Sequence, residues 1–158
     1  LIPATQPSAI NGQPLTATNS ITLSREDYLT HSPYDVFAKL KNNSLTEEQR
    51  WNVIAYLWQS NTTPQSLANG KALYAQNCAA CHGVDGKSEV IVMHMDEPPK
   101  DQSDPVYMKT LPDEYLYLVI CKGGAALGKN FIMPEFGGVI SDQDIRDLIA
   151  WIRAFSAT

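Results

Sequence analysis

The sequence predicts an all-α protein, because its clearest patterns are capped amphipathic helices and no strand–helix–strand pattern surrounds its cysteines. Residues 46–49 read Thr-Glu-Glu-Gln, a capping box that precedes apolar side chains at helical spacing. Residues 141–144 read Ser-Asp-Gln-Asp and begin a second helix of the same kind, which runs to about Phe155. We therefore expect helices joined by irregular loops.

Size and composition indicate an ordinary globular protein. The chain has 158 residues, of which 44% are hydrophobic and 18% charged, so it can hold one domain with a real core, or a small domain plus an extension. No apolar run approaches the length of a membrane-spanning helix. The formal charge of −5 argues against a nucleic-acid partner and favours a protein partner with a basic or neutral docking surface.

One short motif carries the chemistry. Residues 77–83 read Asn-Cys-Ala-Ala-Cys-His-Gly, which contains the Cys-x-x-Cys-His pattern of covalent c-type haem attachment. The thiols of Cys78 and Cys81, one helical turn apart, can each add to a haem vinyl group, and His82 can then bind the iron. A thioredoxin-like pair or half of a zinc site would use the same cysteines, but no second ligand pair is evident, and Cys121 is read as a small apolar residue on a helix. One haem c is predicted.

The chain divides into three predicted segments. Residues 1–20 are rich in proline and small polar side chains and are expected to form an extended tail or linker. Residues 21–64 contain no cysteine, so they are expected to form a helical extension without haem, with short helical segments from Ser24 and from Pro33. Residues 65–158 are expected to form the haem domain.

Residues 66–158 resemble a class I cytochrome c domain of bacterial type, over nearly three-fifths of the chain. Four stretches carry the resemblance, namely residues 70–83 with the cysteine motif, the Pro-Pro-Lys-Asp loop at 98–101, residues 115–124, and Met133-Pro-Glu-Phe136 followed by the last helix. The resemblance implies a cytochrome c fold of about four to five helices around one covalently bound haem c. The helices expected in this domain span residues 66–80, 104–109, 112–122 and 141–155.

The resemblance also implies roles for individual residues. Cys78 and Cys81 match the thioether cysteines, and His82 matches the proximal ligand. Met133, just before a proline, matches the distal ligand, so His82 and Met133 would together hold the iron. Gly70 is expected where the first helix of the domain crosses the last.

Several residues compete for the distal position or support the proximal one. The other candidates for the distal position are Met93, His94, Met95 and Met108. A methionine is more often core filler than a ligand, and Met133 stands out only because of its place in the family pattern. The carbonyl of Pro98 or Pro99 is a candidate acceptor for the second ring nitrogen of His82.

With both axial positions filled, the expected function is one-electron transfer rather than enzymatic catalysis, with no small-molecule substrate. The alternative is a haem enzyme or gas sensor with an open or labile distal site. The absorption spectrum separates the two, because methionine-ligated ferric haem has a weak far-red band. An open site would give a high-spin spectrum or ready binding of carbon monoxide.

The expected setting is a membrane electron-transfer chain. Because haem attachment to this motif takes place outside the cytoplasm in bacteria, we expect a periplasmic location or the outer face of the membrane, with an upstream export signal or anchor. By analogy, the chain could be a free carrier or a peripheral haem subunit of a respiratory or photosynthetic complex, such as alternative complex III, docked through residues 1–60. Trp51 and Trp58 of the extension suit either a core or such an interface.

Overall fold

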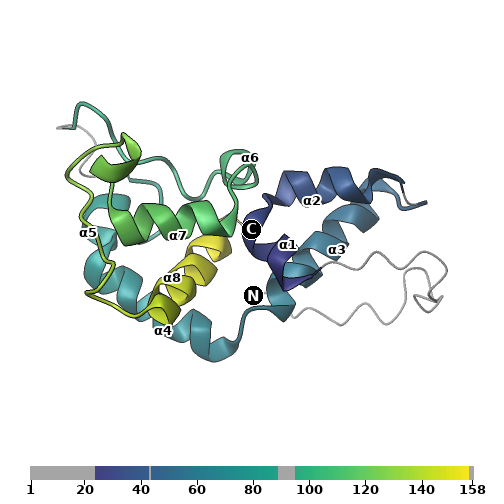
Figure 1. Ribbon diagram of the computed structural model, residues 1–158, viewed down its shortest axis with the longest axis horizontal. Coiled ribbons are helices and arrows are strands. Elements are labelled where there is room, and N and C mark those ends of the chain that lie inside the picture. Colours follow the sequence, from purple (N-terminus) through teal and green to yellow (C-terminus); the bar gives the residue numbers. More distant parts are fainter. Residues whose placement is uncertain (1–23, 43, 89–94, 157–158) are drawn as a thin grey trace.

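The secondary structure consists of helices and loops. The computed structural model describes residues 24–42, 44–88 and 95–156 (Figure 1). The predicted tail at residues 1–20 and the candidate ligands Met93 and His94 lie outside the described residues. Within the described ranges there is no β-sheet, and no helix is long and apolar enough to cross a membrane. The all-α prediction is confirmed.

The N-terminal extension has three short helices and a small core of its own. Its elements are α1 (Arg25–Thr30), α2 (Pro33–Lys39), the 3-10 turn η1 (Leu40–Asn42) and α3 (Glu47–Ser60). Ser24, Ser32 and Thr46 each form a capping box with the residue three positions later, which satisfies backbone N–H groups at each helix start. Val36 and Leu40 are buried in the small core between α2 and α3. The predicted helix starts are confirmed.

The C-terminal part contains the remaining helices. These are α4 (Pro64–Asn77), α5 (Ala79–His82), α6 (Pro105–Met108), α7 (Asp113–Lys122), the 3-10 turn η3 (Ala125–Leu127) and α8 (Asp142–Phe155). The helix predicted over residues 66–80 differs in two ways. It begins earlier, because the side chain of Thr63 caps it and Pro64 suits the first turn. It also breaks at Cys78, which ends α4 and begins α5.

The long helices α4 and α8 cross at Gly70, as predicted. A Cβ atom at this position would lie 2.0 Å from the carbonyl oxygen of Asp147 and 3.0 Å from Cβ of Trp151. Only glycine allows the two backbones to come this close. Asn69, beside it, donates a hydrogen bond to the Asp147 carboxylate at 2.8 Å, so the crossing is also held by polar contacts.

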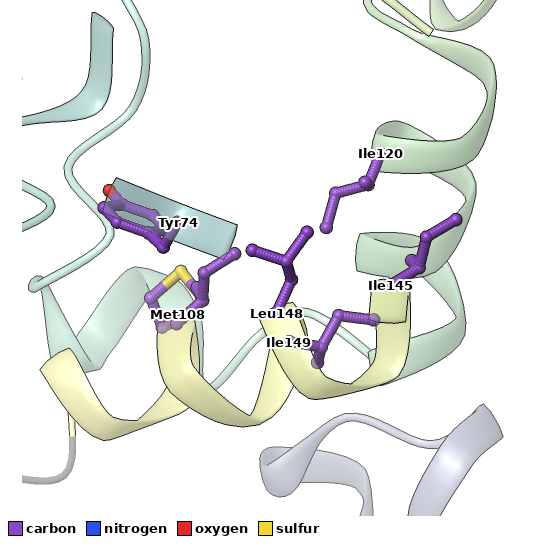
Figure 2. Close-up of a cluster of buried hydrophobic side chains, with 7 residues drawn as sticks. Tyr74, Met108, Ile120, Ile145, Leu148 and Ile149 are labelled. Atoms are coloured by element: carbon purple, nitrogen blue, oxygen red, sulfur yellow. The ribbon is translucent and has the colours of Figure 1, made fainter. Parts of the chain in front are cut away.

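The main apolar core is formed by buried side chains of α4, α6, α7 and α8. Figure 2 shows Leu148 of α8 between Ile120 of α7 and the pair Tyr74 and Met108. Tyr74 packs edge-on against Phe155, with ring centroids 5.1 Å apart. Leu148, Ile120, Tyr74 and Met108 are all buried. The core therefore joins α4, α6, α7 and α8, and it positions the end of α4, where the cysteine motif begins.

The extension packs on the C-terminal part where Trp58 bonds to a buried ion pair. Arg153 of α8 donates to Oδ1 of Asp113, the first residue of α7, from Nε at 2.8 Å and from Nη2 at 2.6 Å. The indole nitrogen of Trp58 on α3 donates to the same oxygen at 3.4 Å, and Trp58 lies edge-on to Tyr28 of α1. Burial, together with the nearby Asp113 carboxylate, raises the pKa of Tyr28, which therefore remains a neutral hydrogen-bond donor. Trp58 thus serves an interface within the chain.

Trp51 is also used inside the chain. Its ring stacks on Phe37 with centroids 4.5 Å apart, and the ammonium group of Lys109 lies 4.6 Å from its ring centroid. The backbone N–H of Tyr34 on α2 donates to the carbonyl oxygen of Lys109 at 3.1 Å. The extension therefore meets the α6–α7 corner at two places, one at Asp113 and one at Lys109.

Candidate haem site

The cysteine motif forms one compact helical turn at the end of α4. The N–H of Cys81 and the N–H of His82 both donate to the carbonyl oxygen of Cys78, at 3.1 and 2.9 Å. Gly83 closes the turn with a φ of 76°, a conformation that glycine adopts without strain. The turn thus places two thiols and one imidazole on a single rigid segment, as covalent haem attachment requires.

The electrostatics of the motif disfavour a reactive redox pair. Burial, and then the neighbouring Cys81, raise the pKa of the Cys78 thiol to about 11. Redox-active Cys-x-x-Cys motifs have the opposite property, a lowered thiol pKa. A zinc site gains no support either, since the part of the chain that the structure describes has no group of three or more His, Cys, Asp or Glu side chains that could hold a metal.

His82 is in the form that binds iron. Burial lowers its pKa, so the imidazole is neutral at physiological pH and one nitrogen carries a lone pair. Its Nδ1 atom is buried without a hydrogen-bond partner. The predicted hydrogen bond to the carbonyl of Pro98 or Pro99 is therefore not present in the structure. Because those prolines lie in a loop with no helix of its own, the sequence could not fix their distance from the ring.

Met133 packs against the same core as the cysteine motif. Met133 and Cys78 both pack against the buried cluster formed by α4, α7 and α8. Gly124 donates its N–H to the Met133 carbonyl at 3.0 Å, and a Cβ atom on Gly123 would lie 3.0 Å from that carbonyl. The glycine pair that ends α7 thus allows the methionine loop to lie directly against the helix end, and Asn130 ties this loop to the carbonyl of Glu97 at 3.0 Å.

The other candidate ligands divide into three groups. Met108 is almost completely buried in the core beside Tyr74, so it fills space there. Met95 is half-buried, whereas Met93 and His94 lie outside the described residues.

The residues of the motif fit a covalently bound haem. Two thiols on one turn, a neutral imidazole with an unsatisfied buried nitrogen and a thioether on the same core match the attachment and ligand groups that a c-type haem uses. Apolar side chains near these residues in the sequence, Val84 and Phe131, are both 81% exposed in the protein alone. A bound porphyrin is a large apolar group of the kind that such side chains would cover.

Two features of this region have no sequence signal. Ser88 is buried with a φ of 61°, and its hydroxyl lacks a partner, yet a serine in a loop looks ordinary in the sequence. Asp113 and Arg153 are 40 residues apart, so their buried pairing could not be read from local spacing.

Comparison with known proteins places the motif in a family. A family model described as Cytochrome C oxidase, cbb3-type, subunit III matches residues 65–152. The cbb3-type cytochrome c oxidase subunit FixPc of Rhizobium leguminosarum bv. viciae is 29% identical over 109 residues, which are 67% of this chain and 34% of that protein. Cytochrome c6 of Parathermosynechococcus lividus is 34% identical over 86 residues, which are 54% of this chain and 86% of that protein.

Among solved structures, cytochrome CL from the methylotrophic bacterium Methylophaga aminisulfidivorans is similar, with a TM-score of 0.46 and 20% identity over 72% of this chain and 69% of that one. The chain spans about a third of the length of FixPc but most of the length of cytochrome c6. The family model covers more than half of the chain. The chain therefore belongs to the family described as Cytochrome C oxidase, cbb3-type, subunit III, as a class I cytochrome c.

Proposed function

We propose that Cys78 and Cys81 attach the haem, that His82 and Met133 are its axial ligands, and that the chain is an electron-transfer subunit and not an enzyme. The observation that carries this proposal is the common core behind the two ends of the site. Cys78, at the start of the His82 turn, and Met133 both pack against the same buried cluster. One rigid core thus holds the proximal turn and the distal loop.

The ligand set decides the chemistry. With His82 and Met133 holding the iron, a bound haem would supply a one-electron couple, and neither ligand position would be open to a substrate. The soft thioether of Met133 favours the reduced iron and so raises the potential relative to two imidazoles. The protein's own part is to keep His82 neutral, to hold Met133 by its backbone, and to exclude water with the core.

Replacement of Met133 tests the ligand assignment. In Met133→Ala we expect loss of the far-red band of the oxidised protein, binding of carbon monoxide after reduction, and a lower midpoint potential, because the thioether no longer stabilises reduced iron. Met95→Leu is the matched control, since Met95 is the other described candidate that is not buried in the core. Retention of the band in Met133→Ala and its loss in Met95→Leu would reassign the ligand, and an open distal site in the unmodified protein would favour the gas sensor or enzyme.

The partner that fits best is a membrane respiratory complex, with the haem domain on the outer face of the membrane. The family description and the likeness to FixPc favour a terminal oxidase over alternative complex III. The exposed side chain of Tyr56 leaves one face of α3 available for docking, although Trp58 is used within the chain. Purification of the tagged full chain from native membranes tests this proposal. Recovery with oxidase subunits is expected, and recovery alone would indicate a free carrier.

A further inference from the structure

The loop that carries the candidate distal ligand rests on the last turn of α7. The N–H of Phe136 donates to the carbonyl oxygen of Ile120 at 3.0 Å, and the N–H of Gly137 donates to the carbonyl oxygen of Cys121 at 2.9 Å. Carbonyl groups in the last turn of a helix have no partner within the helix, so the loop supplies donors that the helix end lacks. The loop and the helix end therefore hold each other in place.

Met133 lies between two such anchors. Its own carbonyl oxygen accepts the N–H of Gly124 at 3.0 Å, just beyond the end of the helix. Only Pro134 and Glu135 separate it from Phe136, and the proline ring fixes one backbone angle of that short connection. The side chains of Met133 and Phe136 both pack against the main core. The place of the thioether is thus set by where the loop rests on α7.

Gly137 allows this close approach. A Cβ atom there would lie 2.7 Å from Sγ and 2.8 Å from the carbonyl oxygen of Cys121, the same oxygen that accepts the Gly137 N–H. Folded proteins do not pack carbon atoms this closely, so the backbone would have to move. Gly137 is exposed and its φ is not positive, so neither burial nor backbone conformation requires a glycine here. Its contact with Cys121 does.

We propose that Gly137 is a positioning residue for the distal ligand, because its lack of a side chain lets the loop rest on α7 and hold the Met133 thioether in place. The proposal rests on the assignment of Met133 as an iron ligand. A side chain at position 137 would lift the loop away from Cys121 and make the closed position of the thioether less favourable. The fraction of molecules with an open distal position would then rise.

The experiment compares the haem-loaded full chain with Gly137→Ala by titration of the reduced proteins with carbon monoxide. Because carbon monoxide must displace the thioether, its apparent affinity is proportional to the fraction of molecules that are open. We expect the affinity to rise about tenfold, which corresponds to about 1.4 kcal/mol and lies within the usual cost of overpacking. An unchanged affinity in Gly137→Ala would overturn the proposal.

Gly138→Ala is the matched control, one residue further along. Gly138 has a φ of 80°, and a Cβ atom added to it would meet no other atom within 4 Å. Alanine there strains the backbone without touching α7, so stability should fall while the affinity for carbon monoxide stays unchanged. An equal rise in affinity in both variants would show that strain anywhere in the loop opens the site, and would overturn the specific role of Gly137.

A double variant keeps the test decisive if Gly137→Ala fails to hold haem. In Cys121→Ala combined with Gly137→Ala the sulfur is gone, but the contact of the new Cβ atom with the backbone carbonyl at 2.8 Å remains. Its affinity for carbon monoxide should exceed that of Cys121→Ala alone, and equal affinities would overturn the proposal.

The ligand assignment is read separately, in the unmodified protein. Absence of the far-red band there would overturn Met133 as a ligand, and the role of Gly137 with it. If only the role of Gly137 is wrong, the band is present and the failure appears in the variants alone.

Discussion

Gly70 sets the distance between the two long helices of the cytochrome domain. Because a Cβ atom there would lie 2.0 Å from the Asp147 carbonyl, Gly70→Ala must push α4 and α8 apart. We expect a loss of about 3 kcal/mol in the free energy of unfolding, near the upper end for overpacked sites. Denaturant unfolding of the haem-loaded protein measures it.

Gly128→Ala is the comparison for Gly70→Ala. Gly128 has a φ of 65°, and a Cβ atom added to it would meet no other atom within 4 Å, so only backbone strain of about 1–2 kcal/mol is expected. If Gly70→Ala loses no more stability than Gly128→Ala, the close approach of α4 and α8 is not what requires glycine at position 70.

Individual residues differ in how far the sequence alone predicts their roles. Cys78, Cys81 and His82 are recognisable because covalent attachment fixes their spacing, and the chain's place in the family supports one haem c. Met133 stays a prediction, because a thioether on a loop has no spacing rule of its own. Ser88 was missed since its conformation and burial arise only when the loop folds back on His82.

At the level of helices, the starts were easier to predict than the interruptions. The starts of α1, α2, α3 and α8 each have a hydroxyl side chain followed three residues later by a side chain that completes the capping box, which is a local signal. The break at Cys78 has none, because alanines follow it and favour a continuous helix. The hydrogen bond from Asn130 to the carbonyl of Glu97 likewise could not be predicted from the sequence, since it joins residues 33 positions apart.

The capping boxes of the extension predict a response to acid. The hydrogen bond from Lys39, followed by those from Ser24, lowers the pKa of Asp27. A carboxyl whose folded pKa is lowered stabilises the fold above its unfolded pKa of about 4, and this contribution is lost as pH falls through the folded pKa. We therefore expect stability to decline below about pH 4, partly through α1.

Asp27→Asn should lower stability at neutral pH and flatten this decline, because the titrating group is gone. Unfolding free energies measured between neutral pH and about pH 3 test it. Glu26→Gln changes the adjacent exposed carboxylate, which is outside the capping box, and should keep the original pH profile. A profile in Asp27→Asn that matches the unmodified protein would assign the acid response to other carboxylates, with Asp35 the first to examine.

For the whole molecule, Trp58 of the extension donates a hydrogen bond to a buried ion pair of the cytochrome domain, that of Asp113 and Arg153. Asp113→Asn removes the charge that Arg153 faces and weakens the acceptor for Trp58, so an uncompensated buried cation remains. We expect a loss of about 3–5 kcal/mol in unfolding free energy. We also expect one cooperative transition in the unmodified protein, reported alike by tryptophan fluorescence and by haem absorption.

The neighbouring residue supplies the control for Asp113→Asn. Glu114 lies 3.7 Å from Arg146, but both side chains are partly exposed, so Glu114→Gln should cost less than about 1 kcal/mol. Two separate transitions in the unmodified protein would contradict the shared folding unit and show that the extension is an independent module.

The crossing of α4 and α8 also imposes an order of events during synthesis. The packing partner of α4 begins at Asp142, some 65 residues after α4 ends at Asn77. At roughly 5–20 residues per second, the ribosome needs about 3–13 seconds to make that stretch. During this interval the cysteine motif has been translated but the helix that completes its support has not. Closure of the core must therefore wait for the C-terminal helix, and until then the two thiols lie on an open chain.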